Sequence, residues 1–197
     1  MTLAEKRHFP GIVIHFKKRL LEIAEKAKDI PQIQIWTESL FFLDNFDMKY
    51  YRILRKFWPP DTWQNKCGEI INKIKTPKAA GSLNNAQALA NVFVEEGYLE
   101  RLLTLLKINT QYFSFVDSNA HHLAGKYPVD LIGLYETGIR VVAETAGKSA
   151  YKEVLRYLKK IEKFQGGVFV ANKLVMEFRE KYRNRKAMMA LLDKYFK

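Results

Sequence analysis

Apolar side chains recur every three or four positions along most of this chain, which is the period of an amphipathic α-helix. In the segment 12–28, Lys and Glu fill one side of the predicted helix. The other side carries an apolar stripe that we expect to face the core, made of Ile12, Phe16, Leu20, Ile23, Ala24 and Ala27. In the segment 148–164 a second stripe is formed by Tyr151, Val154, Leu155, Leu158 and Ile161.

Capping and breaking residues divide this pattern into separate helices. Pro31 suits the first turn of a helix, Asp47 is a natural N-cap, and Gly97 can end a helix in the left-handed conformation. No segment shows the strict alternation of a half-buried strand. We therefore predict an all-α protein of about ten to twelve helices, over 12–28, 31–43, 48–57, 63–75, 86–96, 98–107, 110–125, 128–146, 148–164, 168–183 and 186–195.

Short connections between these helices favour antiparallel neighbours. Two helix pairs look alike, one over 35–55 with a turn at 44–47 and one over 86–107 with a turn at Gly97. The pattern predicts an α-solenoid of irregular antiparallel helical hairpins, similar to tetratricopeptide repeats, with a compact helical bundle as the alternative. We expect one domain over 1–197, and the small, polar segment 76–85 is the place where it would divide.

Composition excludes several classes of protein. A hydrophobic content of 48% is too high for a disordered chain, and a single Cys excludes a disulfide framework. The longest apolar runs are far shorter than the roughly 18 residues that a membrane span needs, and the segment 1–10 lacks the apolar region of a secretory signal. We expect a cytoplasmic protein with no membrane partner.

The charge is concentrated near the end of the sequence. The formal net charge is +12, and residues 148–197 alone hold 14 basic and 5 acidic side chains. Five cations follow one side of the predicted helix 148–164, and we take them as candidate polyanion-binding residues: Lys152, Arg156, Lys159, Lys160 and Lys163. Two interpretations stay open, a surface that binds nucleic acid or an acidic protein, and a solvated face that keeps the protein soluble.

The sequence predicts no catalytic residue, metal ligand or cofactor site, and hence a protein that is not an enzyme. Gly147-Lys148-Ser149 lacks the earlier Gly of a phosphate-binding loop, and we expect Gly147 to end one helix and Ser149 to cap the next. His121 and His122 should diverge by about 100° on a helix and share no metal. Cys67 lies on an apolar stripe and should be buried and inert.

Several short stretches resemble the C-terminal helical region of bacterial SWIM zinc-finger proteins. The residues that carry the resemblance lie at 48–54, 94–97, 99–103, 127–131, 151–155, 158–161, 178–185 and 191–193. The resemblance implies a tetratricopeptide-like helical region, which in that family accompanies a Cys/His zinc finger proposed to bind nucleic acid or protein partners. Because this chain has one Cys, the finger itself is not in it, and zinc binding does not carry over.

Together these features predict a non-enzymatic interaction scaffold that binds a protein or peptide partner on the concave face of stacked hairpins. Aromatic residues such as Tyr51, Trp63 and Phe113 could line a peptide groove, although at helical spacing we expect them in the core. The alternative is an accessory nucleic-acid-binding module that uses the basic C-terminal helices, in the context of a SWIM-type protein.

Overall fold

A computed structural model describes residues 9–75 and 82–196. These residues form eleven α-helices, one 3₁₀ turn and no strand, which confirms the all-α prediction and the number of helices. The elements are α2 (Pro10–Ala27), α3 (Ile30–Leu43), α4 (Met48–Phe57), α5 (Trp63–Ile74), α6 (Leu83–Glu95), α7 (Leu99–Lys107), α8 (Phe113–Ala120), η1 (His121–Leu123), α9 (Pro128–Glu144), α10 (Lys148–Ile161), α11 (Gly167–Lys181) and α12 (Lys186–Tyr195).

Local sequence signals set most helix ends. The Asp47 carboxylate accepts a hydrogen bond from the Lys49 N–H at 2.9 Å, so the predicted N-cap of α4 is confirmed. Pro31 lies in the first turn of α3, and Gly97 adopts a φ of +70° after α6. The predicted helix 110–125 is shorter than expected, because α8 ends at Ala120 and η1 follows it.

The chain divides into two compact units, Met1–Val92 (unit 1) and Phe93–Lys197 (unit 2), with the division inside α6. Most of the predicted linker, residues 76–81, lies outside the described residues. A single domain over the whole chain stays a prediction.

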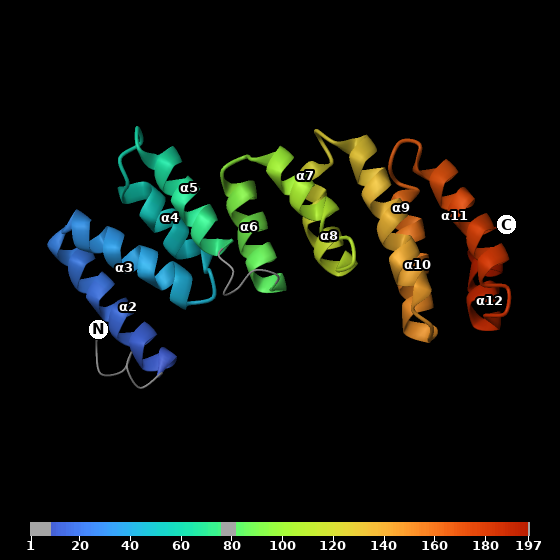
Figure 1. Ribbon diagram of the computed structural model, residues 1–197, viewed down its shortest axis with the longest axis horizontal. Helices are drawn as coiled ribbons and strands as arrows, with labels where there is room; N and C mark the ends of the chain where they lie inside the picture. Colours follow the sequence, from blue (N-terminus) through green and yellow to red (C-terminus); the bar gives the residue numbers. More distant parts are fainter. Residues whose placement is uncertain (1–8, 76–81, 197) are drawn as a thin grey trace. The chain divides into compact units, whose positions relative to one another are not determined.

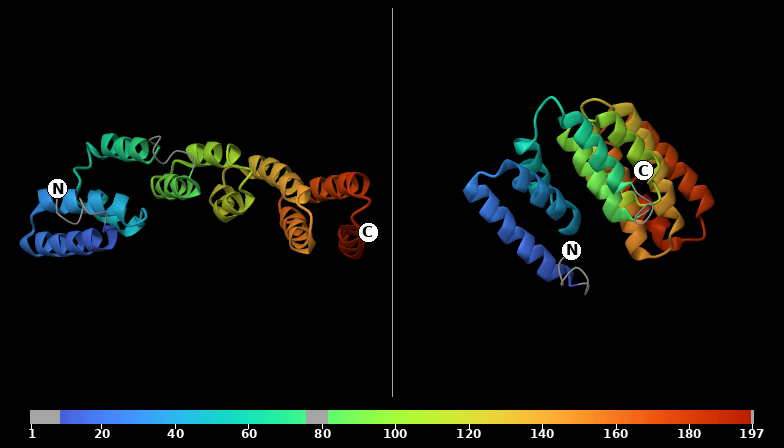
Figure 2. Two further views of the ribbon diagram at one scale, coloured as in Figure 1. Left: turned by 60° about the horizontal axis from the view of Figure 1, so that its bottom comes forward. Right: turned by 60° about the vertical axis from the view of Figure 1, so that its left-hand side comes forward.

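The core of unit 1 forms where α3 packs against both α2 and α4 (Figures 1 and 2). Tyr51 of α4 is fully buried, and its ring lies 5.5 Å from that of Trp63 in α5. The Tyr51 hydroxyl donates to the Sγ atom of Cys67 at 3.4 Å. Cys67 is buried, as predicted, and Tyr51 and Trp63 belong to the core.

In unit 2, α9 is the central helix, since it contacts α7, α8, α10 and α11. α10 packs in turn against α11 and α12. An aromatic cluster joins three of these helices: the ring of Phe113 in α8 lies 5.2 Å from that of Tyr135 in α9 and 4.6 Å from that of Tyr157 in α10. Gly138 of α9 lies directly against the Phe113 ring.

The predicted core stripe of the first amphipathic segment is wrong for most of its members. The buried residues of α2 are Val13, Leu21 and Ala24, whereas the exposed ones include Phe16 and Ile23, at 61% and 62% of their full surface. Apolar residues occupy about half the circumference of α2. Helix α3 packs against only part of this apolar half, so the remaining apolar residues are left exposed.

Candidate functional site

Helix α10 directs its cations away from the core of unit 2. Val154, Leu158 and Ile161 are buried, as predicted, and Tyr157 joins them, whereas Leu155 is half-buried. The predicted basic stripe therefore lies on the outer side of the helix, but its five members have different surroundings. Lys152, Lys159 and Lys163 are exposed, Arg156 is largely exposed, and Lys160 is half-buried.

Two of the five cations belong to an ion-paired cluster around Asp117 of α8. Arg156 Nη1 lies 3.3 Å from Asp117 Oδ2, and Lys160 Nζ donates to Oδ1. The Tyr135 hydroxyl donates to Oδ1 as well. The Asp117 carboxylate is only 12% exposed, so its charge needs these partners. The cluster joins α8, α9 and α10, which gives Arg156 and Lys160 a structural role.

The charges of this cluster shift two pKa values. Burial acts to raise the pKa of Asp117, but hydrogen bonds from Lys160 and Tyr135 outweigh it and hold that pKa below its usual range. The pKa of Tyr135 is raised, mainly because the hydroxyl is buried and, second, because it donates a hydrogen bond to Asp117. Asp117 thus stays ionised and Tyr135 protonated at neutral pH.

Lys152 and Lys159 share their side of α10 with Lys148, which was not among the predicted residues, whereas Lys163 lies in the turn beyond Ile161, because α10 ends earlier than the predicted helix 148–164. Lys159 Nζ lies 3.7 Å from the ring centroid of Tyr195 in α12. Lys148, Lys152, Lys159 and Lys163 make no ion pair with any residue in the part of the chain that the structure describes. We call these four lysines the α10 basic face. Lys148 could have been found, because it precedes Lys152 by one helical turn.

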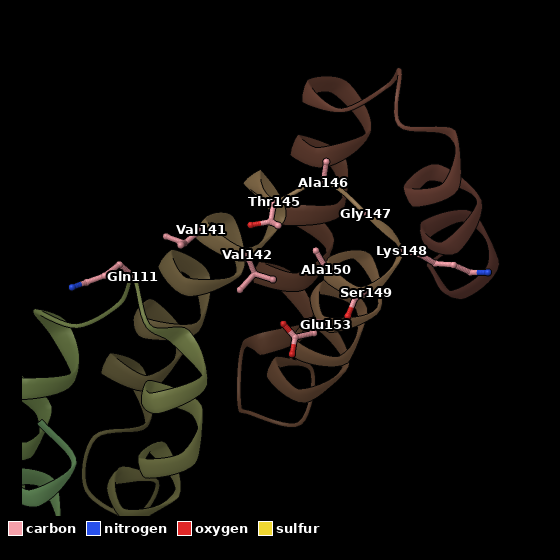
Figure 3. A pocket seen from close by; sticks show the side chains of 10 residues that line it. All are labelled: Gln111, Val141, Val142, Thr145, Ala146, Gly147, Lys148, Ser149, Ala150 and Glu153. Atoms are coloured by element: carbon pink, nitrogen blue, oxygen red, sulfur yellow. The ribbon is translucent and has the colours of Figure 1, made fainter. Parts of the chain in front are cut away.

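A hollow of about 450 Å³ lies beside the start of α10 (Figure 3). Of its ten lining residues only Ala150 is buried, and the Lys148 side chain extends away from the other labelled side chains. The expected cap is wrong here: Gly147, with a φ of +119°, is itself the N-cap, and Ser149 lies in the first turn. Gly147 takes this position because a left-handed φ is accessible to glycine.

His121 and His122 do not diverge as expected, since their ring centroids lie 3.8 Å apart. The angle between neighbouring Cβ positions does not fix where two flexible rings lie. In residues 9–75 and 82–196, no group of three His, Cys, Asp or Glu side chains is placed to hold a metal ion.

Unit 1 has a second kind of surface, an apolar side of α2 that no described residue covers. Ile12, Phe16, Leu20 and Ile23 form it, and we call these four residues the α2 apolar face. They span twelve residues, or about 16 Å of helix from the first Cα to the last. Along one edge, Arg19 and Glu22 pair with each other at 2.7 Å.

A groove of about 530 Å³ lies elsewhere in unit 1, where α2, α3 and α4 meet. Ile33, Ile53 and Phe57 contribute its apolar lining, and Lys28 and Lys56 are both exposed at its rim. Among the described residues neither of these lysines makes an ion pair.

Other ionised clusters link neighbouring helices. In unit 2, Arg140 of α9 donates to both carboxylate oxygens of Glu177 in α11, at 2.9–3.0 Å, and to Glu136 at 2.8 Å. In unit 1, the mostly buried Lys66 of α5 lies 2.7 Å from Glu38 of α3. Both clusters hold pairs of helices together.

Comparisons with protein-family models, with curated proteins and with solved structures found no match to this chain. Among the described residues, no helix is both long enough and apolar enough to cross a membrane.

Proposed function

We propose that this chain is a cytoplasmic, non-enzymatic scaffold of antiparallel helical hairpins, stacked as in a tetratricopeptide-like solenoid, that binds a protein partner. The helical order of unit 2 supports the stacking. There α9 contacts both α7 and α11, and α10 contacts α12, and such contacts between helices two apart in the chain are typical of stacked hairpins. The resemblance to the C-terminal region of bacterial SWIM zinc-finger proteins is part of this proposal.

The α2 apolar face is the observation that carries partner binding. Two of its side chains, Phe16 and Ile23, leave more than half of their surface in water. Covering the four side chains would stabilise a complex by roughly 1 kcal/mol each, because part of each is already in contact with the protein. Clustered apolar side chains on one helix side mark an interaction site more often than scattered ones do.

The shape of this face indicates an amphipathic helix as the partner element. The four residues follow one line along α2, and an apolar helix stripe of a partner presents a matching line at spacings of three and four residues. Such a contact repeats the helix-on-helix packing that α2 already makes with α3 on its other side.

A charge-matched pair of double variants tests this proposal. Phe16→Glu with Ile23→Glu makes the face acidic, and His15→Glu with Lys26→Gln makes the same net change of about two charges at exposed polar sites of α2. The tagged chain is cross-linked in its native host, and partners that bind in stoichiometric amounts are identified by mass spectrometry. We expect the control to keep the wild-type partner and the Phe16/Ile23 variant to lose it.

Folding is checked by circular dichroism and self-association by light scattering. A partner that binds the folded Phe16/Ile23 variant as well as the wild type would refute the assignment of the α2 apolar face. Concentration-dependent dimers that this variant abolishes would show that a second copy covers the face instead.

A further inference from the structure

The α10 basic face has a regular geometry. Lys152, Lys159 and Lys163 follow Lys148 by 4, 11 and 15 residues. Lys163 lies two residues beyond Ile161, where α10 ends, in the turn that follows. At a rise of 1.5 Å and 3.6 residues per turn, the Cα atoms of Lys148, Lys152 and Lys159 span about 16 Å along α10 and about 40° around it. These three lysines therefore start from one narrow row on the outer side of α10, and Lys163 follows the row just beyond the end of the helix.

This row keeps its charge. All four lysines are exposed, and none is ion-paired within the described part of the chain. Glu153 is the carboxylate within α10 and Glu162 is the C-cap that follows it, and both lie outside the row, on its two sides. Glu153 approaches Arg156 at 4.0 Å rather than a member of the row. Four like charges that the fold leaves uncompensated repel one another, and a polyanion would relieve that repulsion.

Asp117 separates these lysines from the rest of the predicted stripe. Arg156 and Lys160 already neutralise its carboxylate, so a polyanion would gain less from them. The lysine row remains as the free charge of α10, and it contains no arginine. Lysine offers a point charge, whereas arginine supplies the bidentate hydrogen bonds that read base edges.

We propose that the α10 basic face binds the phosphate backbone of double-helical nucleic acid without base specificity. A duplex carries one negative charge per about 1.7 Å of its axis, so about 16 Å of it carries about nine charges, and those on its near side face the row. The large apolar side chains that the structure leaves exposed include none from α10, so this face lacks the apolar anchors of a membrane-binding helix.

The test is titration of a labelled mixed-sequence DNA duplex of about 30 base pairs with the full chain, followed by fluorescence anisotropy at several salt concentrations. We expect log K to fall with log salt concentration at a slope of about −3 to −4, as for three or four released counterions. A second duplex of unrelated sequence should bind within about twofold of the first, because backbone contacts carry no base information.

Two triple variants decide whether the row is responsible. Lys148→Gln, Lys152→Gln and Lys163→Gln together should weaken binding about tenfold or more at low salt and reduce the magnitude of the slope by about 2.7. The control removes the same charge from exposed lysines of unit 1 that make no described ion pair: Lys26→Gln, Lys28→Gln and Lys56→Gln. It should bind with the wild-type slope.

Circular dichroism and the urea midpoint confirm that both variants are folded. The proposal is overturned if the wild type does not bind duplex at low salt, or if both triple variants lose binding equally. It is also overturned if the two duplexes differ more than about tenfold in affinity. Binding of polyglutamate or of anionic vesicles that needs the same lysines, without duplex binding, would assign the row to another acidic partner.

Discussion

Two glycines of α9, five residues apart, allow a sharp test of the packing in unit 2. A Cβ at Gly138 would lie within 2.5 Å of three atoms of the Phe113 ring, whereas a Cβ at Gly133 would meet open space. The Phe113 ring cannot move aside freely, because it is buried between Tyr135 and Tyr157. Alanine is better than glycine in a helix by about 1 kcal/mol, so helix propensity alone predicts that both substitutions stabilise.

The structure predicts opposite outcomes. Gly133→Ala should raise the free energy of unfolding by about 0.5–1 kcal/mol, since only the propensity changes. Gly138→Ala gains the same amount but must displace the Phe113 ring, at a cost of about 1–3 kcal/mol for an overpacked core, so it should destabilise. Urea unfolding followed by circular dichroism measures both. Equal stabilisation by the two variants would refute the contact between Gly138 and Phe113, and with it the placement of α8 on α9.

Two ion-paired clusters of unit 2 yield further predictions. Asp117→Asn should lower the free energy of unfolding by about 1–2 kcal/mol at pH 7, because Tyr135 and two cations lose a charged acceptor. Because the pKa of Asp117 is lower in the folded state than in the unfolded state, its charge stabilises the fold at pH values above the unfolded pKa, near 4. This contribution is lost as the pH falls through the folded pKa. Urea unfolding at pH 3 should therefore show a smaller difference between the wild type and Asp117→Asn than at pH 7. The control Glu180→Gln, at an exposed site, should change the free energy of unfolding by no more than about 0.5 kcal/mol at either pH. Arg140→Lys should cost about 1 kcal/mol in the same assay, because lysine cannot make the two-pronged contact with Glu177, and an unchanged urea midpoint would contradict that role.

Helix boundaries were predictable because they depend on near neighbours in sequence. Asp47 caps α4 through a hydrogen bond two residues away, and Pro128 begins α9 at the position where a missing N–H costs nothing. The span 48–57 matches α4 at both ends, and 186–195 matches α12. Gly147 failed as a predicted helix end, because one glycine between two helices suits the N-cap of the second as well as the end of the first.

The two candidate surfaces depend on distant contacts, and the sequence predicted them only in part. Apolar periodicity identifies the arc of α2 that avoids water but not which part α3 covers, so Phe16 was placed in the core. The periodicity of the charges likewise predicted that Arg156 and Lys160 belong to the same polyanion-binding stripe as Lys152. The residue that separates them is Asp117, which precedes Arg156 by 39 positions and is brought near only by the packing of unit 2.

The two proposed interactions differ in physics, and salt dependence therefore distinguishes them. A partner held by the α2 apolar face releases water from apolar surface, and that contribution does not weaken as salt rises. A duplex held by the α10 basic face releases counterions, and at the expected slope its affinity falls about eight- to sixteenfold for each doubling of salt. A complex that uses one of these two faces can thus be assigned to it before its structure is known. A complex that resists salt but depends on Lys152 and Lys163 would contradict the division of roles between the two faces.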